Sequence, residues 1–257
     1  MIYKLDELSS FTCDKSAISN VYIDVGTAID APHSAKWMLE DKNALVVAVE
    51  PNPACIETLK VGRPPTNFHY LRLNDSKILL EGNEIQTIKE NQFLLINCAI
   101  DDVVEKTTAS FYCTDERNIG CSSLLEPTPD LGLDFEKRED VEVTSLEYIL
   151  DSLGLQDLVE IRFVKTDTQG KDFDAVRSLG KYLTRTLFFK CEYNVRNQYH
   201  APNLANDFIK FMEEKKFSIL FDSGYDLYML NHPLALKLQL TQRQTQYFFD
   251  TFCLGSI

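Results

Sequence analysis

Short apolar segments rich in Val, Ile and Phe alternate along the chain with longer segments whose apolar residues recur at helical spacing. Strands that are buried on both faces are apolar along most of their length, so this alternation predicts a mainly parallel sheet with helices on both faces. The predicted fold class is therefore α/β and Rossmann-like. The predicted strands occupy residues 21–25, 45–50, 93–98, 160–166, 186–192, 217–222, 226–230 and 247–253.

Helix-start signals follow several of these strands. Pro32 and Pro53 suit the first turn of a helix, because the N–H group that proline lacks would have no partner there. Asn203 can cap a third helix. The predicted helices occupy residues 32–42, 53–60 and 204–216. Since both prolines come soon after a strand end, two helix N-termini are expected to face the same ligand.

Two segments interrupt the alternation. Residues 61–92 are mostly polar, include a pair of adjacent prolines and are interpreted as an insertion. Residues 103–144 contain an alternating stretch over 107–113 and a bend at Pro127, which predict an antiparallel excursion with a loop. A chain of 257 residues with 44% hydrophobic content is long enough for one large core. We therefore expect a single domain over residues 1–257 with these two insertions.

The charge balance limits the partners of the protein. The chain carries 26 Lys and Arg residues against 39 Asp and Glu residues, a formal net charge of −13. Nucleic acids and anionic membranes are bound by basic surfaces, so neither is expected as a partner. The N-terminal segment lacks the apolar centre of a signal peptide, and no segment approaches the roughly 18 consecutive apolar residues of a membrane span. Seven cysteines without a Cys-x-x-Cys pair favour reduced thiols. These features predict a soluble, cytoplasmic protein.

Candidate chemistry begins at the ends of the first two long strands. Gly26 follows the first, and a glycine lets the backbone turn and approach a ligand because it has no Cβ. Glu50 closes the second, where a carboxylate can accept both hydroxyls of a ribose. The pairing predicts a nucleoside cofactor, but dinucleotide enzymes and methyltransferases share it, so the reaction stays open. The candidate cofactor residues at these two ends are Asp24, Gly26, Thr27, Ala28, Asp30, Glu50, Pro51 and Asn52.

The order of several further segments resembles the FkbM-type S-adenosylmethionine-dependent methyltransferases over most of residues 21–195. The matching segments are Ile23-Asp24-Val-Gly26, Val49-Glu50-Pro-Asn52-Pro53, Asn97-Cys-Ala99-Ile-Asp101, Ser122-Ser-Leu124, Val143-Thr-Ser-Leu146-Glu147, Phe163-Val-Lys165-Thr-Asp167-Thr-Gln169-Gly170-Lys-Asp172 and Cys191-Glu192. The resemblance implies a class I Rossmann-like methyltransferase fold with a mainly parallel, seven-stranded sheet. It also implies S-adenosylmethionine as cofactor and methylation of a hydroxyl oxygen on a sugar or small metabolite. It places Asn97, Ala99 and Ile100 around the adenine.

The chain departs from the family pattern at named positions. The turn after Gly26 keeps only the first glycine of the usual Gly-x-Gly-x-Gly. Gln169 stands where the usual Asp-x-Glu-Gly has its Glu, and Glu147 stands where the usual Leu-Asp has its Asp. Asp30, also in the first turn, can bond the amino group of a bound methionine moiety or cap the helix that begins at Pro32.

Methyl transfer from a sulfonium requires mainly alignment of the reactants, but a hydroxyl acceptor also needs a group that takes its proton. Asp167 is the leading candidate base and also a cofactor contact, because it ends the strand over 160–166 at the carboxyl edge of the sheet. The alternative is that Asp167 orders the turn after it. His200 is a second candidate base. The candidate acceptor contacts on the same edge are Gln169, Glu192 and Arg196.

Other functions and cofactors stay open from the residues alone. A divalent metal can bind between Asp167 and Glu192, which end nearby strands, but no spacing requires one. An NAD(P)-dependent oxidoreductase would be expected to carry a fuller Gly-x-Gly-x-x-Gly turn. A non-catalytic nucleoside-cofactor-binding protein is a further alternative. The expected acceptor is a small molecule or a saccharide.

Overall fold

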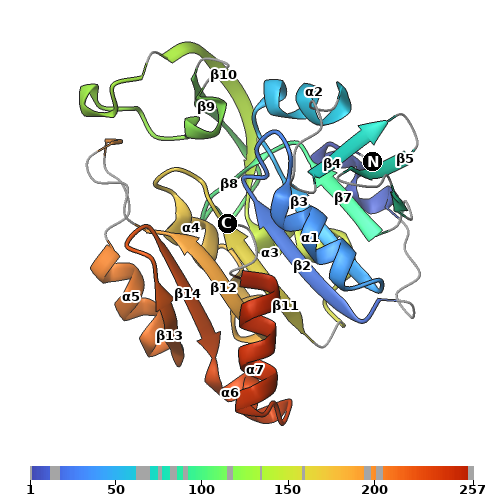
Figure 1. The fold of residues 1–257 in the computed structure, drawn as a ribbon. Coiled ribbons are helices and arrows are strands. Elements are labelled where there is room, and N and C mark those ends of the chain that lie inside the picture. Colours follow the sequence, from blue (N-terminus) through green and yellow to red (C-terminus); the bar gives the residue numbers. More distant parts are fainter. Residues whose placement is uncertain are drawn as a thin grey trace.

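The computed structural model describes residues 2–11, 18–61, 70–74, 77–81, 86–88, 92–114, 118–133, 135–157, 160–193, 198–200 and 205–253. Its central sheet contains the strands β1 (Ile2–Tyr3), β2 (Asn20–Val25), β3 (Ala44–Val49), β7 (Phe93–Ile96), β11 (Ile161–Thr166), β12 (Thr186–Glu192), β13 (Phe217–Asp222) and β14 (Asp226–Asn231). They lie in the order β1-β7-β3-β2-β11-β12-β14-β13 (Figure 1). β14 is antiparallel to both of its neighbours, and the other pairs are parallel. The predicted mainly parallel sheet is confirmed.

The sheet has eight strands, one more than the seven that the resemblance implies. The additional strand is β1, which pairs with β7 at the edge of the sheet. Two residues are too few to show a periodic pattern, so the sequence did not indicate this strand.

The strand order reverses between β2 and β11. From β2 the chain moves outward through β3 to β7, and it later returns to the other side of β2 to form β11 and β12. Open α/β sheets bind ligands at the carboxyl ends of the strands beside such a reversal. Gly26 directly follows β2, and Asp167 directly follows β11. The fold therefore brings these two residues to the place where a ligand site is expected.

Helices cover both faces of the sheet (Figure 1). One face packs against α1 (Pro32–Glu40), α2 (Pro53–Val61) and α6 (His232–Lys237). The other face packs against the 3-10 helices η1 (Leu5–Ser10) and η6 (Gly180–Arg185) and against α3 (Leu146–Ser152), α4 (Asp172–Arg177) and α5 (Ala205–Glu214). Side chains of β2 alternate between the two layers, with Tyr22 in the first and Ile23 in the second. The sheet is thus buried on both sides.

The helices predicted over 32–42, 53–60 and 204–216 are confirmed as α1, α2 and α5, with small shifts at their ends. Asn203, the predicted cap of the third, lies outside the described residues. Among the residues that the structure describes, no helix is both long enough and apolar enough to cross a membrane.

Two smaller sheets occupy the interrupting segments. Strands β9 (Thr107–Thr114) and β10 (Phe135–Thr144) pair antiparallel, and β10 also pairs in parallel with β8 (Ala99–Ile100). The predicted antiparallel excursion over 103–144 is confirmed. In the other segment, β4 (Tyr70–Asn74), β5 (Lys77–Glu81) and β6 (Gln86–Ile88) form an antiparallel sheet. The polar composition of that segment did not indicate these strands.

The strand predicted over 247–253 is wrong, because this segment is helical. The helix α7 (Gln242–Phe248) continues into the π-helix η7 (Phe249–Cys253). Thr241 and Gln244 form a capping box at the start of α7, and this Thr-x-x-Gln signal is present in the sequence. Two consecutive aromatic residues at the junction of α7 and η7 pack against rings of β12 and β14. Their burial comes from a helix lying on the sheet.

Candidate active site

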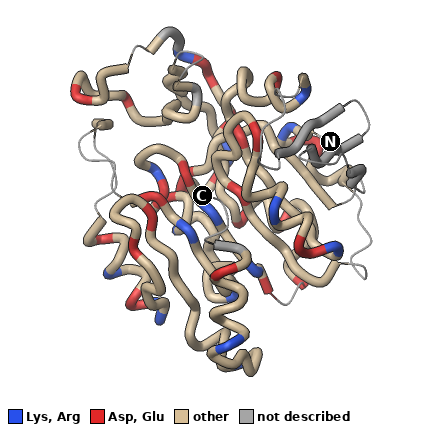
Figure 2. Tube along the Cα trace, in the orientation of Figure 1, with Lys and Arg blue, Asp and Glu red and all other residues tan. Residues whose placement is uncertain are grey.

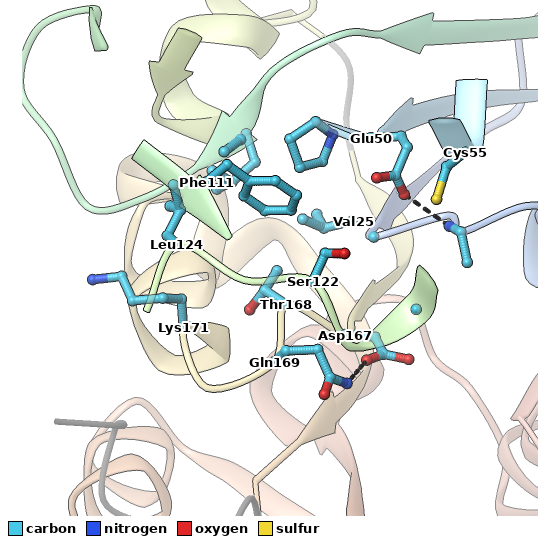
Figure 3. A pocket seen from close by; sticks show the side chains of 16 residues that line it. Val25, Glu50, Cys55, Phe111, Ser122, Leu124, Asp167, Thr168, Gln169 and Lys171 are labelled. Carbon is cyan, nitrogen blue, oxygen red and sulfur yellow. Dashed lines mark hydrogen bonds between the residues drawn. The ribbon is translucent and has the colours of Figure 1, made fainter. Parts of the chain in front are cut away.

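A cavity opens at the carboxyl ends of β2, β3 and β11, beside the reversal of the strand order (Figure 3). Together with the solvent at its mouth it measures about 670 Å³. The predicted site residues that line it are Gly26, Ala28, Glu50, Pro51, Ala99, Ile100, Asp167 and Gln169. The structure therefore brings together residues from four separate parts of the sequence.

Gly26 lies where the backbones of three strands meet. Its φ is 76°, and a Cβ added there would lie 2.0 Å from the carbonyl oxygen of Asp167. Its N–H donates to the carbonyl of Val49 at 2.9 Å. The Lys165 ammonium donates to the carbonyl of Gly26 from the other side. A glycine is needed here because β11 ends directly against the turn, so the residue also has a structural function.

Asp24 is fully buried and does not line the cavity. Its Oδ2 accepts from both the N–H and the hydroxyl of Ser34, the third residue of α1, at 3.2 and 2.6 Å. Its Oδ1 lies 3.4 Å from the Lys165 ammonium. Burial would lower the pKa of Lys165, but Asp24 and Asp167 outweigh burial and the pKa is raised. The Asp24–Lys165 pair thus joins α1 to the carboxyl ends of β2 and β11.

The start of α1 differs from the capping alternative for Asp30. The N-cap residue is Ala31, whose φ is 43° and which provides no side-chain cap. Asp24 satisfies the N–H of Ser34 instead. Neither Asp30 nor the buried Thr27 lines the cavity. The contact of Asp30 with a methionine moiety stays a prediction.

Glu50 is 4% exposed and reaches the cavity from the end of β3 (Figure 3). Its Oε2 accepts from the N–H of Ala28 at 2.8 Å, and its Oε1 accepts from the N–H of Asn52 at 2.9 Å. Burial raises the pKa of Glu50 to about 7, although these two N–H groups lower it in part. A carboxylate has about four acceptor positions. Two of them are therefore available to hydroxyl groups in the cavity.

Asn52 and Asn97 hold the Glu50 loop in place and do not line the cavity. Asn52 accepts from the N–H of Ala54 at 3.0 Å and donates to the Ser122 hydroxyl at 3.1 Å. Asn97 donates to the carbonyl of Glu50 at 3.0 Å and to that of Pro51 at 3.3 Å. Both asparagines thus act on the loop that carries the carboxylate.

The apolar wall of the cavity is larger than the sequence indicated. Ala99 and Ile100 line it as predicted, and Phe111 and Leu124 from the excursion line it as well. Phe111 is on the buried face of β9, where it alternates with exposed positions. That alternation was visible in the sequence, but only the pairing of β9 with β10 shows which face is turned toward the cavity. Apolar walls of this kind suit an aromatic ring.

Asp167 and Gln169 lie at another part of the cavity wall (Figure 3). The Asp167 side chain is 42% exposed, and its Oδ2 lies 3.8 Å from the Lys165 ammonium. Gln169 has a φ of 56°. Its Nε2 donates to Asp167 at 2.8 Å and to Glu192 at 2.9 Å, while its Oε1 accepts from the Tyr199 hydroxyl at 3.0 Å. Glu192 itself does not line the cavity.

The remaining predicted residues are placed differently. His200 is exposed and does not line the cavity; its N–H donates to the carbonyl of Glu126. The neighbouring Tyr199 is turned inward and buried instead, a residue that sequence reasoning missed. Arg196 lies outside the described residues. Within the described ranges, no group of three or more His, Cys, Asp or Glu side chains could hold a metal ion.

Comparisons with known proteins give one match. The model of the methyltransferase FkbM domain matches residues 24–219. No curated protein and no solved structure gave a significant match. The matched range runs from the end of β2 into β13 and contains all the residues that line the cavity.

Proposed function

Because the chain belongs to the FkbM methyltransferase family, we propose that it transfers a methyl group from S-adenosylmethionine to a hydroxyl oxygen of a small molecule or saccharide. The observation that carries this proposal is the pairing of two carboxylates in one cavity. Glu50 is buried and fixed by backbone N–H groups, whereas Asp167 is partly exposed. The buried Glu50 carboxylate suits the binding of an unvarying cofactor, and the partly exposed Asp167 carboxylate suits contact with a reacting group.

The residues around Glu50 fit the adenosyl part of the cofactor. The two acceptor positions that Glu50 has left can take the two hydroxyls of a ribose. Ile100 and Phe111 provide apolar surface for the adenine, and Ala28 lies in the turn that would face the methionine part. When bound, S-adenosylmethionine supplies a methyl group on a cationic sulfur, which is a good leaving group.

Asp167 is the proposed base for the acceptor hydroxyl. It lines the cavity, and Lys165 and Gln169 fix the direction of its carboxylate. A base that is held in place at the acceptor contributes about 10²- to 10⁴-fold to a proton-transfer step. Asp167 would take the hydroxyl proton as the oxygen attacks the methyl carbon. Because Glu50 and Asp167 line the same cavity, cofactor and acceptor would be held next to each other. This supplies the alignment that the reaction needs.

The charge distribution supports an uncharged or cationic acceptor. Figure 2 shows Lys and Arg positions scattered along the described chain among the more numerous Asp and Glu positions. Lys171 lines the cavity, but its ammonium is engaged by Asp101, at 2.9 Å, and by Asp174. At the Asp167 part of the wall a polyanionic acceptor would meet the Asp167 carboxylate and a Lys171 ammonium that two other carboxylates already engage.

Calorimetric titration of the purified protein with S-adenosylmethionine, S-adenosylhomocysteine, NAD and NADP tests the proposal. Micromolar binding of the two adenosyl ligands, without binding of the nicotinamide ligands, is the expected result. Transfer of radiolabelled methyl to a panel of sugars and hydroxylated metabolites would then identify the acceptor. Binding of NAD or NADP alone would overturn the proposal in favour of an oxidoreductase. Cofactor binding without transfer to any acceptor would favour a non-catalytic binding protein.

A further inference from the structure

Gln169 is the centre of a hydrogen-bonded group that joins four segments of the chain. Its amide contacts Asp167 after β11, Glu192 at the end of β12 and Tyr199 in the following segment. The backbone carbonyl of Gln169 accepts from the Ser123 hydroxyl at 2.8 Å. We call Asp167, Gln169, Glu192 and Tyr199 the Gln169 network. Figure 3 shows the Gln169 amide pointing at the Asp167 carboxylate at the edge of the cavity.

The hydrogen-bond donors of Gln169 are fully used within this network. A primary amide has two N–H bonds. One is directed to Asp167 and the other to Glu192. The sequence suggested that Gln169 contacts the molecule that receives the methyl group. A substrate could take a hydrogen bond from this amide only if the bond to Asp167 or the bond to Glu192 were broken. Any influence of Gln169 on a substrate would therefore be exerted through Asp167.

Tyr199 and Ser123 contact Gln169 from outside β11. Tyr199 is buried, and its single hydroxyl proton is shared between the backbone carbonyl of Cys121, at 2.7 Å, and the Gln169 Oε1, at 3.0 Å. The segment around Tyr199 is bridged to Pro127 of the excursion. The left-handed backbone of Gln169, with a φ of 56°, is fixed by the bond from Ser123. Both ends of the Gln169 residue are thus held from outside β11.

The network lies among many acidic groups. Burial, the largest cause, and the nearby Asp167, Asp172 and Asp226 together raise the pKa of Glu192 to about 9, while Lys165 lowers it in part. The Tyr199 hydroxyl and the Cys121 thiol also face this region. An amide at position 169 donates to an oxygen of both carboxyl groups at once, whether or not Glu192 is protonated. A Glu there would instead add a third carboxylate with no proton to donate unless it took one up.

We propose that Gln169 is a positioning residue for methyl transfer, whose amide holds the Asp167 carboxylate toward the acceptor and keeps it apart from Glu192. The acceptor's place beside Asp167 rests on the proposed function. The hydrogen-bond arrangement does not depend on it. An uncharged bridge in this position allows Asp167 to act as base without sharing a proton with Glu192.

The test compares Gln169→Glu and Gln169→Ala with the control Gln246→Glu. Gln246 is exposed on α7 and donates to Asp250 at 2.8 Å, so the control makes the same chemical change beside an aspartate away from the cavity. Carbon-13 spectra of the labelled carboxyl groups are recorded from pH 5 to 10, with the Glu192 signal assigned from Glu192→Gln. The amide stabilises the charged form of Glu192. We therefore expect the Glu192 midpoint to rise by about 0.5 pH unit or more in Gln169→Ala, and further in Gln169→Glu.

Thermal unfolding gives a second readout that needs no acceptor. When the pKa of a carboxyl group is higher in the folded than in the unfolded protein, the free energy of unfolding decreases as pH rises between the two pKa values. The melting temperature of Gln169→Glu, relative to that of the unaltered protein, should therefore decrease by about 3 °C or more as pH is raised from 5 to 8. The deficit of Gln246→Glu should be small and independent of pH. An unchanged Glu192 midpoint in both Gln169 variants, or equal pH behaviour of Gln169→Glu and Gln246→Glu, would overturn the role of Gln169.

Kinetics separate positioning from a general structural effect. With an acceptor in hand, Gln169→Ala should lower kcat about tenfold or more and leave the affinity for S-adenosylhomocysteine within about twofold. Loss of affinity and kcat together would instead indicate a structural role. Absence of cofactor binding in the unaltered protein would overturn the proposed function, while the carboxyl titrations would still decide whether Gln169 holds the two carboxylates.

Discussion

The Glu50 part and the Asp167 part of the cavity hold their carboxylates in different ways. Glu50 is fixed by two backbone N–H groups, which any sequence that keeps the turn and the loop can provide. Asp167 is fixed by the side chains of Lys165 and Gln169. Backbone support is independent of the residue type at the supporting positions, whereas side-chain support is changed by a single substitution. The comparison suggests a constant cofactor site next to an adjustable acceptor site.

Replacing Asp167 by Asn should have the largest effect on activity. The change keeps the shape of the side chain but removes the base, so kcat is expected to fall by about 10²- to 10⁴-fold. Calorimetric affinity for S-adenosylhomocysteine should stay nearly the same, because the cofactor is held mainly at the Glu50 part. Unchanged turnover of an identified acceptor would show that Asp167 only orders its turn.

Replacing Gly26 by Ala should have the largest effect on stability, because it disturbs the place where both parts of the cavity meet. The added Cβ would lie 2.0 Å from a backbone oxygen, at a φ of 76°. Overpacking together with left-handed strain is expected to cost about 2–5 kcal/mol in the free energy of unfolding.

Gly132→Ala is the matched control for this change. Gly132 has a φ of 66°, but a Cβ there would meet no atom within 4 Å. Only the backbone strain remains, so a cost of about 1 kcal/mol is expected. Urea unfolding measures both variants, and equal costs would contradict the close approach of β11 to the turn.

Glu50→Ala tests the constant part of the cavity. Loss of the ribose contacts should weaken binding of S-adenosylhomocysteine by about 1–3 kcal/mol. Glu57→Ala is a suitable control, because Glu57 is an exposed residue of α2 whose partner is the nearby Lys60. Equal affinity of the folded Glu50 variant and the control would remove Glu50 from the cofactor site.

Glu50 should also make cofactor binding depend on pH, and this effect should be smaller than that of Glu50→Ala. Hydroxyl donors favour the charged carboxylate, so binding should lower the pKa of Glu50 from its value of about 7 in the free protein. The affinity should then fall about fivefold as pH drops from 7 to 6, because the free protein must lose a proton to bind. Glu50→Gln should abolish this dependence. Calorimetry in two buffers of different ionisation enthalpy would detect the released proton, and its absence would contradict the assignment.

The sequence predicted those site residues that directly follow a strand. Gly26, Glu50 and Asp167 each end an apolar segment, and a parallel sheet brings its carboxyl ends to one edge whatever the loops do. Contacts across longer distances were not predictable in this way. Phe111 reaches the cavity only because β9 and β10 pair, and Tyr199 reaches Gln169 only because its segment is bridged to Pro127.

Two local signals gave wrong or incomplete predictions for physical reasons. The aromatic segment over 247–253 resembled a strand, but the capping box at Thr241 starts a helix whose rings still reach the core. Capping of α1 was one of the two predicted roles of Asp30. Instead Asp24, in the preceding strand β2 and ten residues before Ser34, accepts from the N–H of Ser34 in the first turn of α1. A bond from the preceding strand leaves no pattern at the helix start itself.

The structure of the protein in complex with S-adenosylhomocysteine tests the central claim most directly. We expect the ribose hydroxyls on the Glu50 carboxylate, the adenine against Ile100 and Phe111, and the sulfur facing the part of the cavity that contains Asp167. A ligand bound with its ribose away from Glu50, or with Asp167 shielded from the sulfur, would contradict the division of the cavity into a cofactor part and an acceptor part.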